Sequence, residues 1–211
     1  MTRNEALRRF AIFTTGVLVC SVGVAFITRA GLGTSPISST PFVLSLITPV
    51  SMGVYTLAFN LFFLLCEGLL IGKLTVAQAL QVPVTVLFSL CVDGALTLIP
   101  SQYGGPWGPS AVYLVIGCTI MSFGVYLEVF ADIIMLPGEA FVRALSQRLG
   151  KNFGNVKVCF DSCLTMIAAA VALWAFGYLN GVGIGTVVSA LAVGQLVKLW
   201  GWLYRRRQRN Q

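Results

Sequence analysis

Residues 29–40 read RAGLGTSPISST, and this polar stretch interrupts one of the most apolar regions of the chain. Gly31 and Gly33 suit the end of a helix, since glycine breaks helical runs. Pro36 suits the first turn of a new helix, where a backbone N–H is not needed. The apolar segment 36–48 that follows is too short to cross a bilayer, so we expect a re-entrant or interfacial half-helix.

On both sides of this break the chain has the composition of a membrane protein. Of its 211 residues, 57% are apolar and 10% are charged, whereas soluble domains carry about 25% charged residues. Lipid offers the backbone no hydrogen-bond partner, so continuous apolar runs of about 20 residues predict transmembrane helices. We therefore predict an all-α membrane protein, a single domain over residues 1–211. Six such runs occur, at 10–28, 54–71, 76–99, 111–129, 158–179 and 184–204.

A second break near Pro137 indicates an internal repeat. When the chain is aligned with itself at an offset of 101 residues, glycines and prolines at helix boundaries coincide, and Pro36 falls on Pro137. Chance matching of apolar helices is the alternative, and these boundary residues argue against it. Each copy, 10–99 and 111–204, holds three spans, so the second copy enters from the opposite side. This predicts a 3+3 inverted repeat, a common plan of secondary transporters, with a second short helix over 137–149.

The start of the 36–48 helix is the first candidate binding site. Free N–H groups at a helix N-terminus carry a partial positive charge and attract anions or carboxylates. Asn60 is a further polar candidate, and it is the repeat equivalent of Asp161. Arg29 either binds a solute or extends to the lipid head groups, as arginine at helix ends often does. The predicted solute-binding residues are Arg29, Gly33, Thr34, Ser35 and Asn60.

Carboxylates inside or beside the spans form the second candidate group, because such residues are costly in lipid and usually face a cavity. Asp93 lies well inside the third span and is the strongest candidate for a proton or cation contact. Asp161 has an alternative role, since Lys157 one turn away can pair with it. Glu67 lies near the end of its span, and extension towards the interface would explain it. The predicted coupling-ion or polar-cavity residues are Asp93, Glu128, Asp132, Glu139 and Asp161.

The residue inventory argues against enzymatic and metal chemistry. The chain has no histidine, and its 6 cysteines all fall inside apolar spans, where a thiol is usually a small apolar filler. Cys159 and Cys163 lie one turn apart, but two thiols are weak evidence for a metal. The glycines in 181–186 follow no strand, so they form no dinucleotide fingerprint. We expect no enzyme activity, no metal and no cofactor.

Lys and Arg are unevenly distributed, and this sets the expected orientation. They cluster before the first span, between the fourth and fifth spans and after the last one, whereas the three connectors on the other side contain only Arg29. Positive residues remain on the cytoplasmic side, so both termini should be cytoplasmic. The net charge of +7 is then explained by anchoring to membrane lipid, and we expect no binding to nucleic acid.

Two short motifs resemble the bacterial YczE/YyaS/YitT group of membrane proteins. They are RAGLGTSPISS at residues 29–39 and GIGT at residues 183–186. The resemblance covers most of the chain. It implies a multi-pass protein of the bacterial cytoplasmic (inner) membrane and suggests a transporter, but it names no solute.

These observations predict a small secondary transporter or permease for a small polar solute or ion. Alternating access would then move the two repeats about a site near the middle of the membrane. The alternative is a non-transporting membrane partner, a regulatory or assembly protein that docks through its basic tail and the 137–149 helix. The oligomeric state is open, and a homodimer is one possibility.

Overall fold

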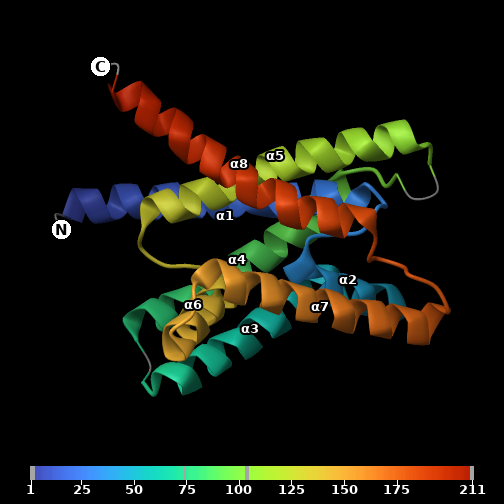
Figure 1. Cartoon of the computed structure of the whole chain (residues 1–211), viewed down its shortest axis with the longest axis horizontal. Coiled ribbons are helices and arrows are strands. Elements are labelled where there is room, and N and C mark those ends of the chain that lie inside the picture. The colour runs from blue at the N-terminus through green and yellow to red at the C-terminus, as the bar shows by residue number, and fades with distance from the viewer. Residues whose placement is uncertain (1–2, 74, 103–104, 210–211) are drawn as a thin grey trace.

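The computed structural model describes residues 3–73, 75–102 and 105–209, and within these residues all regular structure is helical (Figure 1). Six helices are long and apolar enough to cross a membrane, and two are short. The predicted all-α membrane fold with six spans is therefore confirmed. The helices are α1 (Arg3–Arg29), α2 (Pro36–Ile47), α3 (Met52–Ile71), α4 (Val76–Leu98), α5 (Trp107–Ala131), α6 (Pro137–Leu149), α7 (Phe153–Phe176) and α8 (Ile184–Arg209).

Helix boundaries fall at the prolines and glycines of the connectors. Pro36 and Pro137 occupy the first turns of the two short helices, α2 and α6, where proline costs no hydrogen bond. Gly72, Gly150 and Gly177 follow α3, α6 and α7 with φ of 73°, 62° and 75°. Glycine adopts this left-handed conformation without steric cost, so it ends the helix and turns the chain.

The two halves of the chain share one order of elements, a long helix, a short one and two long ones. Each short helix packs against a long helix of the other half, α2 on α7 and α6 on α3. α4 packs on α1 and on α3, whereas α8 packs on α5. Both described ends of the chain lie at the same end of the bundle (Figure 1).

The two halves pack most closely along the seam between α1 and α5, which is lined by Gly16, Gly23, Gly117 and Gly124. A Cβ atom added at Gly124 would lie 2.5 Å from the backbone nitrogen of Cys20, and one at Gly117 would lie 2.7 Å from that of Ile27. The two backbones therefore touch, as small residues allow between membrane helices. Later residues of α1 meet earlier residues of α5, so the two helices run antiparallel.

The contacts of this seam are reciprocal at the offset of 101 residues. Gly23 meets Met121, and the matching pair is Cys20 with Gly124. Likewise the contact of Gly16 with Glu128 is matched by the contact of Ile27 with Gly117. A two-fold relation between two copies produces such exchanged pairs. These contacts agree with the repeat at this seam, and the inverted repeat over all six spans remains a prediction.

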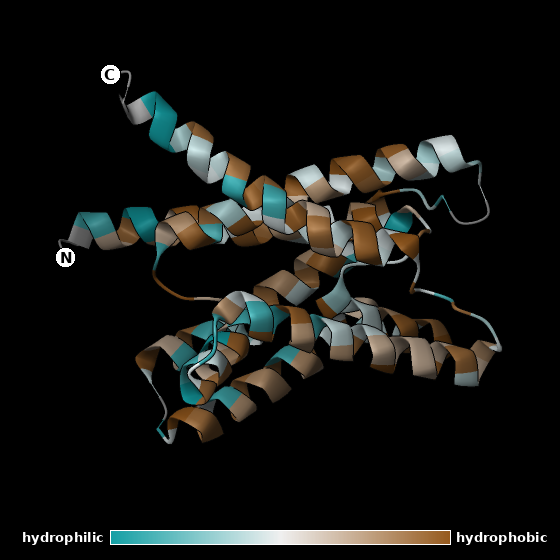
Figure 2. Cartoon of the chain, viewed as in Figure 1, coloured by the Kyte–Doolittle hydropathy of each residue, from teal (hydrophilic) through white to brown (hydrophobic). Residues whose placement is uncertain are grey.

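The buried core follows the seam and extends towards α4. Its members include Phe13 and Val17 of α1 together with Phe88 and Val92 of α4. Large apolar side chains on the outer helices are exposed instead, with Trp174 of α7 84% exposed. Such a surface suits contact with lipid tails. Hydrophilic residues gather at the end that carries both termini and on α6 (Figure 2).

Candidate functional site

Three hollows between the described residues bear on function, and polar side chains line part of each. The first, which we call the arginine vestibule, has a volume of ≈ 370 Å³ and lies where α1 and α4 end. The second, the carboxylate vestibule, has ≈ 330 Å³ and lies at the opposite end of α4. The third, the central cavity, has ≈ 50 Å³ and is lined by residues of helices α1 to α6 and of the α5–α6 connector.

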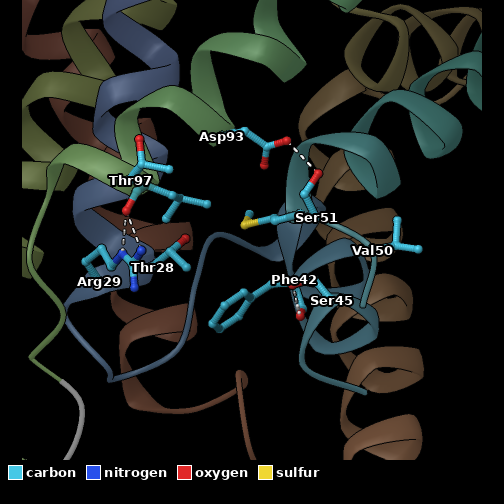
Figure 3. Close-up of a pocket in the computed structure, with 10 residues that line it drawn as sticks. Thr28, Arg29, Phe42, Ser45, Val50, Ser51, Asp93 and Thr97 are labelled. Carbon is cyan, nitrogen blue, oxygen red and sulfur yellow. Dashed lines mark hydrogen bonds between the residues drawn. The ribbon is translucent and has the colours of Figure 1, made fainter. Parts of the chain in front are cut away.

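The arginine vestibule holds one of the predicted solute-binding residues. Arg29 ends α1, and its Nε donates to the backbone carbonyl of Leu96 at 3.1 Å, with a second bond from Nη2 to the same oxygen. Arg29 also forms part of the wall together with Ser45, Ser51 and Thr97 (Figure 3). The guanidinium is thus fixed to the end of α4 and borders the vestibule.

Asp93 lies in the same vestibule, where its carboxylate joins α4 to α3. Oδ1 accepts the backbone N–H of Gly53 at 2.7 Å, and Oδ2 accepts the hydroxyl of Ser51 at 2.5 Å (Figure 3). Ser51 and Gly53 form the first turn of α3, whose free N–H groups favour a negative charge. This geometry gives Asp93 a structural role as a cap, and its role as an ion contact remains a prediction.

The carboxylate vestibule is walled by the end of α3, the start of α4, the end of α5 and α6. Asp132 follows α5 with φ of 48°, the left-handed conformation that ends the helix. Arg143 of α6 is the one basic residue among the lining side chains. Polar and charged residues of this wall are Glu67, Gln81, Glu128, Asp132, Arg143 and Gln147.

The central cavity collects polar groups from both halves of the chain. Asn60 and Thr56 come from α3, and Ser38 comes from α2. Glu139 reaches the cavity from the first turn of α6, and Glu128 from α5. Phenylalanine rings complete the wall, from Phe59, Phe63 and Phe88. Predicted members of both candidate groups, Asn60 among the solute residues and Glu128 and Glu139 among the carboxylates, therefore meet here.

Glu128 occupies the position between the central cavity and the carboxylate vestibule, since it lines both. Its side chain is 5% exposed, and Oε1 has no hydrogen-bond partner. The thiol of Cys20 and the carboxyl of Glu139 are its electrostatic neighbours. A buried carboxylate costs several kcal/mol unless a partner neutralises it. This carboxyl therefore needs a proton or a cation from outside the protein.

Glu67 is a second buried carboxyl in the carboxylate vestibule. It is 7% exposed, and Oε2 has no partner. Its carboxyl lies beside the side-chain amides of Gln78 and Gln81. The expected extension of Glu67 towards the interface is therefore not what the structure shows, because α4 covers this end of α3 and encloses the side chain.

Other predicted residues lie outside the three hollows. Thr34 is fully buried, and its hydroxyl bonds to that of Thr28 at 2.7 Å, while Ser35 donates to Ser38 at 3.0 Å. Gly33 adopts φ of 110°, close to the start of α8. These groups hold the α1–α2 connector in place. Asp161 accepts a bond from Lys157 at 2.8 Å, so the local ion pair accounts for it.

A stripe of polar side chains on α4 escaped prediction from the sequence. Gln78, Gln81, Thr85 and Ser89 are all buried, and each has a polar atom without a partner. Hydroxyls inside helices usually donate to the carbonyl three or four residues earlier, as Thr97 does here. Their spacing of three or four residues places them on one face, and that periodicity was the available signal.

An apolar plug closes the central cavity from the arginine vestibule. Val24 lines the central cavity and Thr28 lines the arginine vestibule, and these two residues lie one helical turn apart on α1. Such a turn rises about 5.4 Å. The plug is formed by buried members of the core, namely Val24, Phe42, Met52, Phe88 and Val92. On the other side, only Glu128 is shared with the carboxylate vestibule.

Comparison with known proteins gives one match. Residues 7–201 match the model of a family described as a family of unknown function, DUF6198. No curated protein and no solved structure matches the chain.

Proposed function

The chain belongs to the DUF6198 family, and we propose that it is a small secondary transporter for a small polar solute. The observation that carries the proposal is the pair of vestibules at opposite ends of the bundle, with a small polar cavity between them. Alternating access requires such an arrangement, because the site must open to one side while it is closed to the other. In this state the apolar plug closes the arginine side.

The distribution of polar groups supports a path through the bundle. The buried stripe on α4 begins at Gln78 near the carboxylate vestibule and continues to Ser89, one turn from Asp93 in the arginine vestibule. Eleven residues separate its ends, which corresponds to about 16 Å along a helix. Unpartnered hydroxyls and amides over that length favour a route that is solvated during part of the transport cycle.

The repeat supports the same mechanism. The exchanged contacts of the α1–α5 seam fit two copies related by a two-fold axis, and each short helix packs on the opposite half. We infer that the halves form an inverted repeat, and that exchange of their packing opens the arginine side as the carboxylate side closes.

We place the carboxylate vestibule on the cytoplasmic side of a bacterial inner membrane. It lies at the end of the bundle where both termini and many hydrophilic residues gather (Figures 1 and 2). The terminal segments carry clusters of arginine, and basic segments favour the cytoplasm. The sequence resemblance to the YczE/YyaS/YitT group supports a bacterial location. The arginine vestibule then faces outward.

Flux through reconstituted vesicles tests the proposal. We expect saturable uptake of at least one member of a panel of radiolabelled small polar solutes. Glu128→Gln should abolish this uptake, because the substitution removes the acidic group between vestibule and cavity. Glu5→Gln is the matched control, since that carboxyl is exposed and pairs with Arg9. Absence of saturable uptake over the whole panel would refute transport.

A docking role is the second candidate, and the end of α8 favours it. The last turns of α8 project beyond the bundle (Figure 1) and expose Arg205, Arg206 and Arg207. Deletion of residues 205–211 separates the two candidates. Uptake that persists after deletion supports transport, whereas a cellular function lost without any loss of flux supports docking.

A further inference from the structure

We propose that the central cavity binds a small protonated amine, of the size of ammonium or methylammonium, at Glu128 and Glu139. This inference rests on the proposed transport function and names the class of its solute. The chain is positively charged overall, yet four of its 7 acidic residues line the central cavity and the carboxylate vestibule. They are Glu67, Glu128, Asp132 and Glu139.

No basic side chain neutralises these carboxyls within the described residues. Ion pairs there join Arg9 to Glu5 and Lys157 to Asp161. Arg143 borders the vestibule, but it is exposed and donates to the sulfur of Met135 at 3.6 Å. The local charge therefore attracts a cation and repels an anion.

The unpartnered atoms of these walls are oxygen acceptors. They are Oε1 of Glu128, Oε2 of Glu67 and Oε1 of Gln81, all in side chains at least 93% buried. Acceptors without donors fit a ligand that brings its own N–H groups, since such charge-assisted hydrogen bonds are the strong ones. Ammonium carries four N–H groups, and a protonated primary amine carries three.

The size and the aromatic wall of the central cavity narrow the class further. A volume of ≈ 50 Å³ accommodates a small ligand of a few non-hydrogen atoms, since one water molecule needs about 10–15 Å³ of cavity volume. Phe59, Phe63 and Phe88 line the cavity, and phenylalanine faces attract cations. Among the described residues no group of three or more His, Cys, Asp or Glu is placed to hold a metal ion. A small monovalent cation that carries N–H groups fits these walls better than a divalent metal.

A binding route follows from the position of Glu128. The cation enters the carboxylate vestibule, where Glu67 and Asp132 raise its local concentration. It passes Glu128 and is then held between the carboxyls of Glu128 and Glu139, close to Asn60. No covalent step is involved, and the positive charge of the bound cation compensates the negative charge of the buried carboxylate.

Thermal unfolding of the purified protein in detergent tests the site separately from transport. Ammonium, methylammonium, tetramethylammonium, sodium and potassium chlorides are compared at equal ionic strength and pH. We expect ammonium and methylammonium to raise the Tm by about 5 °C or more at concentrations about 100-fold above their Kd, and to raise it further with the logarithm of concentration. The other cations should give no such shift, since they lack N–H groups.

Two variants complete the experiment. Glu128→Gln should lose the ammonium shift, and Glu5→Gln should keep it. If Glu128→Gln does not fold, the cation series on the native protein still decides. Equal shifts with sodium, potassium or tetramethylammonium, or no ammonium-dependent shift at all, would overturn the proposal.

Flux measurements distinguish this failure from failure of the transport proposal. Amine binding without flux keeps the site and removes the transport function. Saturable flux of a neutral or anionic solute, without an ammonium shift, keeps transport and overturns the amine site.

Discussion

Substitution of Gly23 by alanine is expected to destabilise the protein by about 2 kcal/mol. The added Cβ atom would lie 2.5 Å from the Cα atom of Met121, whereas ordinary contacts of a Cβ atom begin near 3.4 Å. Helices α1 and α5 would have to separate by roughly 1 Å, and overpacking of this kind costs about 1–3 kcal/mol. Alanine regains about 0.5–1 kcal/mol over glycine inside a helix. Packing is also lost along the rest of the seam, so the overpacking cost should lie near the top of its range, which leaves a net cost of about 2 kcal/mol.

The assay is thermal unfolding in detergent, followed by far-ultraviolet circular dichroism. For a chain of this length, about 2 kcal/mol corresponds to a fall in Tm of roughly 4–8 °C. Gly124→Ala should give a fall of similar size, because Gly124 meets Cys20 as Gly23 meets Met121. Gly94→Ala is the control, since a Cβ atom there meets nothing within 4 Å. Its Tm should stay the same or rise.

Two outcomes would refute this reasoning. If Gly23→Ala melts like the native protein, α1 and α5 are not in backbone contact. If Gly23→Ala and Gly124→Ala differ by much more than the error of the measurement, the seam is not reciprocal, and the main structural support for the repeat is lost.

Three further predictions follow from the site. Asp93→Ala should lower the free energy of unfolding by about 1–2 kcal/mol, because the first turn of α3 loses its charged cap. The ammonium-dependent shift in Tm should persist in this variant. Loss of that shift would instead give Asp93 a part in binding. Thr85→Val removes a buried unpartnered hydroxyl, so it should maintain or raise the Tm yet slow vesicle uptake. Thr119→Val on the exposed face of α5 should leave uptake unchanged; equal uptake in both variants would exclude a route along α4. In a cysteine-free background, Lys151→Cys should react with an impermeant maleimide only after the cells are opened, and Tyr178→Cys should react in intact cells; the reverse pattern would invert the proposed orientation.

Much of the fold was predictable from the sequence because lipid leaves the backbone few choices. Long apolar runs must form helices, and Pro36 and Pro137 mark the starts of the short ones. Gly72 and Gly150 end helices through the left-handed conformation, which other residues adopt only at a cost. These signals are local, and local signals can be recognised without an alignment.

The candidate site was only partly predictable, because it depends on which faces of distant helices meet. Asp93 is a deep acidic residue by sequence, but the first turn of α3 folds back to it and uses both carboxylate oxygens. Glu67 was expected to reach the interface, yet α4 encloses it. The hydroxyls of Thr85 and Ser89 blend into an apolar run on a hydropathy scale, and only their unpartnered atoms in the folded chain mark them.

The seam also restricts how a transport cycle can proceed. Helices whose backbones touch cannot slide past one another without a clash, so α1 and α5 are best regarded as a fixed axis. Movement must then involve the helices packed around them with larger side chains. α2 carries Phe42 of the plug and Ser38 of the central cavity, and α6 carries Glu139 of that cavity. Because both short helices line the central cavity, a shift of α2 away from the seam would open the arginine side. The matching shift of α6 towards the seam would close the side where Glu128 now lies.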